Sequence, residues 1–205
     1  MIEVMIVIGV VLLLAMVLLP ALAQRSVRSR RIQCTCHLKQ VGIAFRIWAG
    51  DHGNKYPMQV SVTNGGTLEF VAGPNAWMHF LVMSNELNTP KILFCPSDSD
   101  AGRRAASTFP GFTGNFNLSY FAGVDADDRE PQRFLTGDRN LTNGTALTRG
   151  MLTLTTNHLA GWTGEMHAHQ GNVGLADGSV QGYSTAALRS ALANTGLETN
   201  RLTMP

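Results

Sequence analysis

Residues 1–24 read MIEVMIVIGVVLLLAMVLLPALAQ, and this stretch decides which fold the sequence predicts. The twenty residues from Val4 to Ala23 carry no charge, and at ~1.5 Å per residue they would form about 30 Å of helix, the thickness of a bilayer core. Because the run is apolar on every side, a membrane span is favoured over a buried core helix. A cleaved secretory signal is the alternative, since Ala21-Leu22-Ala23 resembles a cleavage site, although no basic residues precede the apolar run. Glu3 stands at the edge of the run, where a carboxylate is costly in lipid.

The helix is predicted to continue beyond the apolar run, from about residue 2 to about residue 50. Gly50, Gly53 and Pro57 are stop signals at its end. Pro20 lies inside it, and a proline there removes a backbone donor and favours a bend. The second half is amphipathic, because apolar residues recur at helical spacing on one stripe: Cys34, Leu38, Val41, Phe45 and Trp48.

The rest of the chain predicts a mostly antiparallel sheet, because short apolar stretches alternate with turn residues. Around Asp177-Gly178, NVGLADGSVQGY predicts a hairpin with a two-residue type I′ turn. The following STAALRSALANTGL predicts a helix with Ser184 as N-cap and Gly196 as its stop. The fold class is therefore α+β, with one long N-terminal helix packed on a small sheet. The other candidate strands are residues 59–63, 67–72, 91–95, 118–122, 133–137 and 151–155, and residues 75–88 are a candidate short helix.

Charge is distributed unevenly between the predicted helix and the body. Residues 4–50 carry six basic side chains and no acid, whereas residues 51–205 carry ten basic and thirteen acidic side chains. A nucleic-acid-binding protein would be expected to carry a basic face on its folded body. This body is slightly acidic, so nucleic acid is not a predicted partner.

Segments at both ends of the sequence match a known pattern. Met1-Ile2-Glu3, the apolar run and Pro20 are followed by RIQCTCHLKQVGIAFRIWAGDHGNKYP at residues 31–57, and His167 is followed by nine residues and then Asp177-Gly178. In these segments the chain resembles type IV pilin-like proteins, above all the type II secretion pseudopilins with a prepilin-type N-terminal cleavage and methylation segment and a C-terminal H-X9-DG motif. The resemblance covers about residues 1–57 and 165–182.

The resemblance implies a pilin-like fold in two parts. Residues 1–24 would be the transmembrane and assembly half of the N-terminal helix. Residues 25–205 would be a periplasmic globular domain that includes the amphipathic half of the helix and the hairpin at 165–182. The implied location is the bacterial inner membrane, with a single pass and the C-terminal domain in the periplasm. The arginines that follow the apolar run would, by the charge rule alone, place the body in the cytoplasm, and the resemblance is preferred here.

Glu3 is the main assembly residue that the resemblance implies, with Pro20 as a second. In the family, a basic leader ending in glycine precedes a mature chain that begins Phe-Thr-Leu-Ile-Glu, and the leader and the first two of these residues are missing before Met1-Ile2-Glu3. A true start upstream of Met1 is therefore expected, and a prepilin peptidase would then be a partner. A truncated product is the alternative. The partner of Glu3 would be the N-terminal amine of a neighbouring subunit. The alternative is a carboxylate near a helix N-terminus, where the helix dipole favours it.

The three cysteines suggest one disulfide. In an oxidising periplasm Cys34 on the helix stripe could bridge Cys95, which would leave Cys36 as the spare. Closing a loop of that length would stabilise the fold by about 4 kcal/mol. Buried free thiols are the alternative.

The histidines before the C-terminal hairpin and the acids of residues 125–130 are weak candidates for a metal site. His167 and His169 lie close to Asp177, which would suit a metal or acid–base site, but no third ligand has a suitable spacing. A loop that leads into the hairpin is the preferred interpretation, with no metal and no cofactor. Hard oxygen ligands in DADDRE are weak calcium candidates, with a solvated acidic turn preferred: Asp125, Asp127, Asp128 and Glu130.

The function predicted from these features is a non-enzymatic pseudopilin subunit of a type II secretion or related type IV filament system. Its partners would be other pilin-like subunits and inner-membrane lipid. The alternative is a single-span, envelope-anchored binding domain that does not polymerise.

Overall fold

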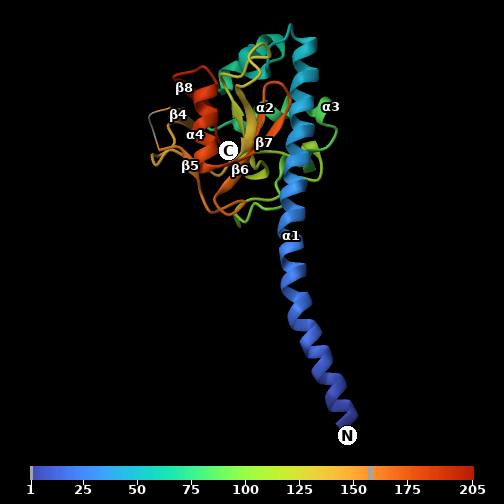
Figure 1. Cartoon of the computed structure of the whole chain (residues 1–205). Helices are drawn as coiled ribbons and strands as arrows, with labels where there is room; N and C mark the ends of the chain where they lie inside the picture. Colours follow the sequence, from blue (N-terminus) through green and yellow to red (C-terminus); the bar gives the residue numbers. More distant parts are fainter. Residues whose placement is uncertain (1, 157–158) are drawn as a thin grey trace.

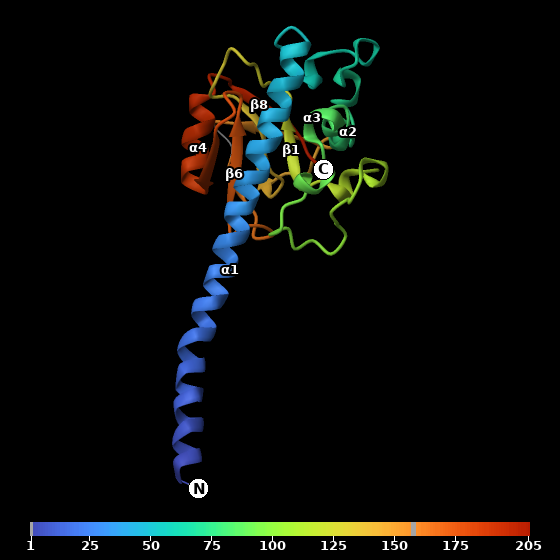
Figure 2. The same cartoon turned by 90° about the vertical axis from the view of Figure 1, so that its right-hand side faces the viewer.

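The computed structural model describes the backbone of residues 2–156 and 159–205, and the side chains of the same residues except 17–27. Helix α1 (Ile2–Asp51) is a rod whose C-terminal part packs against a globular body, while its N-terminal part extends away from that body (Figure 1). The view turned by 90° shows the same arrangement (Figure 2). The body is therefore built around one end of α1.

The predicted pilin-like fold, in which one long apolar-then-amphipathic helix packs on a small sheet, is wrong in this form. The apolar first part of α1 is exposed rather than packed, and the sheet has six strands. Within the described residues, no helix combines the length and the apolar character that crossing a membrane requires. This finding contradicts the predicted single-pass location in the bacterial inner membrane.

The main sheet is antiparallel throughout. Its strand order is β4-β8-β1-β2-β6-β7, so the chain's last strand lies in the interior of the sheet. A separate two-stranded ladder pairs β3 with β5. The strands are β1 (Tyr120–Gly123), β2 (Phe134–Asp138), β3 (Leu141–Thr142), β4 (Met151–Thr155), β5 (Gly161–Trp162), β6 (Gln170–Leu175), β7 (Val180–Ser184) and β8 (Thr199–Thr203).

Each face of the sheet has its own hydrophobic core. Side chains alternate between the faces of a strand, so neighbouring Tyr120 and Phe121 in β1 belong to different cores. On the first face α1 contributes the whole predicted stripe from Cys34 to Trp48, which is buried. On the second face α4 (Thr185–Asn194) contributes Leu188 and Leu192. The sheet thus lies between α1 and α4, as Figure 1 shows.

Several predicted elements differ from those observed. The candidate strands at 59–63, 67–72 and 91–95 are irregular or 3₁₀ turns, whereas β8, β3 and β5 were not predicted. Local chemistry explains the turns: Gly65 has φ 83°, and Pro90 opens a turn whose first free amide, that of Lys91, donates to the Thr89 hydroxyl. The short helix divides into two, α2 (Ala76–Leu81) and α3 (Ser84–Leu87). The short 3₁₀ turns are Pro57–Gln59, Val62–Asn64, Leu68–Phe70, Pro90–Leu93, Phe109–Gly111 and Asn115–Asn117.

Candidate functional site

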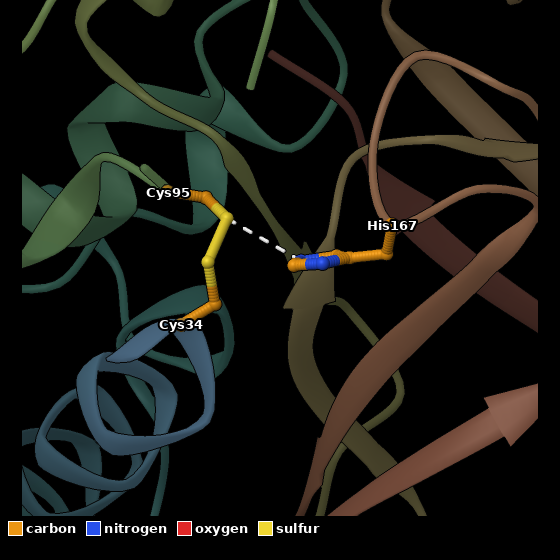
Figure 3. Close-up of side chains that lie close together, drawn as sticks. All are labelled: Cys34, Cys95 and His167. Atoms are coloured by element: carbon orange, nitrogen blue, oxygen red, sulfur yellow. Dashed lines mark hydrogen bonds between the residues drawn. A yellow bond between two sulfur atoms is a disulfide. The ribbon is translucent and has the colours of Figure 1, made fainter. Parts of the chain in front are cut away.

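The structure joins Cys34 of α1 to Cys95 by a disulfide, with the two Cα atoms 5.3 Å apart (Figure 3). Both side chains are fully buried, whereas Cys36 is a free, exposed thiol. Among the α1 residues with described side chains, Cys34 is the first that is fully buried. The bond therefore fixes the helix at the point where it enters the body.

His167 lies against this disulfide. Its Nε2 is 3.4 Å from Cys95 Sγ, as the dashed line in Figure 3 marks, and 3.3 Å from Asp138 Oδ2. The backbone at His167, Ala168 and His169 is left-handed, with φ values of 51°, 51° and 61°. Non-glycine residues adopt this conformation at a cost of roughly 1–2 kcal/mol each. Such local strain persists only where surrounding contacts hold it, and it is often found at functional sites.

Asp138 is the buried acid of this site. Its Oδ2 accepts hydrogen bonds from the backbone and side-chain nitrogens of Asn172, at 2.7 and 2.8 Å. Burial raises the pKa of Asp138 to about 7, although the bonds from Asn172 lower it. Burial, together with the positive charge of nearby Arg31, lowers the pKa of His167 to about 4, although Asp98 opposes this shift. At neutral pH the imidazole is therefore uncharged, so its 3.3 Å contact with Asp138 is not an ion pair.

The other end of the H-X9-DG segment docks on the same helix. Arg46 of α1 donates to the carbonyl of Asp177 at 2.7 Å, and the Tyr56 hydroxyl donates to the carbonyl of Ala176 at 3.0 Å. Only Gly178 in this turn has positive φ, at 84°. The Gly178 amide bonds the Leu175 carbonyl and the Leu175 amide bonds the Ser179 carbonyl. These bonds define a three-residue type I turn with a glycine bulge, and the predicted two-residue type I′ turn is wrong.

Between these ends, β6 runs along α1. The Thr35 hydroxyl donates to Asn172 Oδ1 at 3.4 Å, and the Arg31 guanidinium donates to the side chain of Gln170. Sequence reasoning did not identify Asp138, Asn172 or Arg31 as parts of the site. The pairing of β2 with β6 brings Asp138 to Asn172, and the packing of α1 along β6 brings Arg31 to Gln170.

A buried ion pair holds the two loops that carry Cys95 and His167. Arg139 makes a bidentate contact with Asp98, at 2.8 and 2.7 Å, and donates to Glu165 at 2.7 Å. Burial raises the pKa of Asp98, but the hydrogen bonds from Arg139 and Ser119 outweigh it and the pKa is lowered. Asp98 is thus a charged anchor three residues after Cys95.

The acidic loop does not form a converging set of ligands. Asp125 pairs with Arg201, Asp127 pairs with Arg129 at 3.1 Å, and Asp128 lies 3.8 Å from Arg46. Glu130 is exposed in the same loop. Because three carboxylates face three different arginines, the loop gives no support to the calcium hypothesis.

The two predicted assembly residues lie on α1, far from this site. Glu3 is exposed in the first turn of the helix. Pro20 falls in the stretch whose side chains lie outside the described residues, although the helix continues through it.

Comparison with known proteins adds no further information. No family model matches the chain, and neither a curated protein nor a solved structure matches it.

Proposed function

We propose that the chain is a non-enzymatic subunit of a filament of the type II secretion or type IV kind, which joins its neighbours through the exposed part of α1. One observation carries the proposal. Large apolar side chains of α1 expose more than half of their surface: Ile2, Val4, Met5, Ile6, Val7, Ile8, Val10, Val11, Leu12, Leu13, Leu14 and Met16. Fully burying one such side chain is worth about 1.5–3 kcal/mol, so this surface favours an apolar partner strongly.

A like helix from a neighbouring subunit suits this surface. An all-round apolar helix can pack with several others at once, as in the centre of a bundle. The outer side of the packed part of α1 adds a second strip, since Ile32, Ile43 and Ile47 are each more than half exposed. Ile43 and Ile47 are one helical turn apart, so a partner helix could contact both.

Glu3 would set the register of this packing. It is the only charged residue among the described side chains of the exposed N-terminal part, residues 2–16. In an apolar helix bundle a lone carboxylate needs a specific polar or cationic partner, and a subunit shifted along the axis would leave it unpaired.

The test is assembly of the purified chain, measured by sedimentation velocity and electron microscopy over a range of concentrations. Leu13→Arg should abolish assembly because it places a charge in the interface, and Leu159→Arg, at an exposed leucine of the body, is the matched control. Glu3→Ala should replace regular filaments with irregular aggregates, and Glu198→Ala should not.

Two results would refute the proposal. One is a wild-type chain that stays monomeric at every concentration, which would favour a binding domain that does not polymerise. The other is Leu13→Arg assembling as well as Leu159→Arg does.

A further inference from the structure

We propose that, when its disulfide is reduced, the chain binds one zinc ion through Cys34, Cys95 and His167, with Asp138 as the fourth ligand. The proposal is independent of filament assembly. Within the described residues, Cys34, Cys95 and His167 are the one group of potential ligands whose donor atoms all lie within 4.8 Å of one another. Two thiolates and an imidazole are the ligands that zinc prefers in tetrahedral protein sites.

The distances suit this ion. Zinc–sulfur bonds of about 2.3 Å and zinc–nitrogen bonds of about 2.0 Å place the ligand atoms of a tetrahedral site roughly 3.4–3.8 Å apart. His167 Nε2 is already 3.4 Å from Cys95 Sγ. The Cα atoms of the cysteines are 5.3 Å apart, so side-chain rotation alone could separate the two sulfurs once their bond is broken.

Asp138 lies beside this group through its contact with His167, although its carboxylate is not among the donor atoms that lie within 4.8 Å of one another. Its Oδ2 is 3.3 Å from His167 Nε2, within the range that two ligands of one ion require. Its Oδ1 is buried without a hydrogen-bond partner, which is unusual for a carboxylate that is fully shielded from solvent. A cation beside this carboxylate would supply the missing interaction.

The backbone also supports a binding role for His167. His167 and the two residues that follow it are left-handed, and in this conformation the imidazole points toward the sulfurs rather than toward solvent. A cavity of about 320 Å³ borders His167, and Arg30, Arg31, Ser97 and Gln170 also line it, so the imidazole lies next to an open part of the surface.

The chemistry balances as two separate steps. A dithiol reductant gives up two electrons and two protons, so that the Sγ–Sγ bond breaks, each cysteine becomes a thiol and the reductant becomes a cyclic disulfide. Zinc then replaces the two thiol protons, which pass to solvent. Reoxidation of the cysteines would release the ion. The C-terminal part of α1 would therefore be held to the body by the disulfide in the oxidised form and by the zinc ion in the reduced form.

The experiment uses the full chain with Cys36→Ser, which removes the spare thiol. Reduced and oxidised samples are titrated with zinc against a chromophoric chelator, and cobalt is used as a spectroscopic probe of thiolate coordination. The reduced form should bind one equivalent with thiolate-to-cobalt charge-transfer bands, and the oxidised form should bind none. Zinc should also raise the Tm of the reduced form alone.

Matched variants assign the ligands. His167→Ala should abolish stoichiometric binding, whereas His169→Ala, in the same left-handed turn, should leave it unchanged. Asp138→Asn should weaken binding by at least about 10-fold, because losing a ligating carboxylate should cost no less than losing an outer-shell partner of a zinc site.

Three outcomes would overturn the proposal. The first is equal zinc uptake by the reduced and oxidised forms. The second is retention of the cobalt bands in His167→Ala. The third is a reduced chain that does not bind zinc and does not refold when zinc is added. The last outcome covers the case in which reduction unfolds the protein.

Discussion

Removing the disulfide between Cys34 and Cys95 should lower the free energy of unfolding by about 4 kcal/mol. The two positions are 61 residues apart, and the chain-entropy relation assigns about this value to a loop of that length at 25 °C. For a domain of this size the same change lowers Tm by roughly 8–16 °C. The change to make is alanine at both positions, because alanine leaves no polar atom in a site that is fully buried.

The assay is urea unfolding of the oxidised wild type and the double variant, followed by tryptophan fluorescence. The midpoint should fall, and the m value should rise because the unfolded chain without the cross-link exposes more surface. Cys34→Ala alone should be nearly as destabilising as the double variant, since either change removes the same bond. Cys36→Ala is the control, because this thiol is free and exposed.

A loss below about 1 kcal/mol in the double variant would refute this reasoning, since it would mean that loop closure is not what the bond contributes. Single variants whose effects add to give the double-variant effect would also refute it. In that case each cysteine would stabilise the fold through its own packing.

Three further predictions concern groups that the structure buries or strains. Arg139→Ala should cost about 3–5 kcal/mol, because it leaves Asp98 buried without its partner, whereas Arg129→Ala, in an exposed pair, should have no measurable effect. His79 is fully buried, and burial lowers its pKa to about 4. Between pH 6.5 and pH 4 the imidazole is therefore protonated in the unfolded chain but neutral in the native chain. Stability should therefore fall by about 3 kcal/mol as the pH falls from about 6.5 to about 4, and His79→Asn should remove this part of the pH dependence. Gly178→Ala should cost about 1–2 kcal/mol, because φ at this position is 84°.

Each of these predictions has its own deciding comparison, made by denaturant unfolding. For the ion pair, an Arg139→Ala variant as stable as Arg129→Ala would contradict the argument. For His79, the deciding quantity is the wild-type stability minus that of His79→Asn, and a difference that does not change between pH 6.5 and pH 4 would contradict it. For the turn, Gly178→Asn should cost less than Gly178→Ala, because asparagine tolerates left-handed φ. Equal costs would point to a steric clash instead.

Parts of the fold with a strong local signal could be predicted from the sequence. The stripe from Cys34 to Trp48 is buried as its spacing indicates, and Ser184 caps α4 by accepting a bond from the Ala187 amide at 3.3 Å. The strands predicted within residues 59–72 are wrong. Apolar residues at alternate positions there resemble a strand, but Gly65 and local side-chain hydrogen bonds stabilise 3₁₀ turns instead. Strand β8 has the polar sequence TNRLT, and only its place in the interior of the sheet makes it a strand.

The candidate site also has one part that the sequence predicts and one part that it does not. Cys34 and Cys95 could be proposed as a pair because cysteines are few and one lies on the buried stripe. The contact of His167 with Asp138 could not be foreseen, because it depends on the register in which Gly137 faces Val173. That register is set by packing on both faces of the sheet, which no single segment encodes.

The spacing of the H-X9-DG segment follows from the helix that it accompanies. His167 lies at the level of Cys34, and the Asp177 carbonyl binds Arg46, which is twelve residues further along α1 (46 minus 34). Twelve residues of helix rise about 18 Å. The six residues of β6 span roughly the same length at about 3.3 Å per residue, and the turns at either end add little. The nine intervening residues are therefore what a single strand needs to run from the disulfide to the turn, so the length of the segment is under structural constraint while its end residues make the contacts.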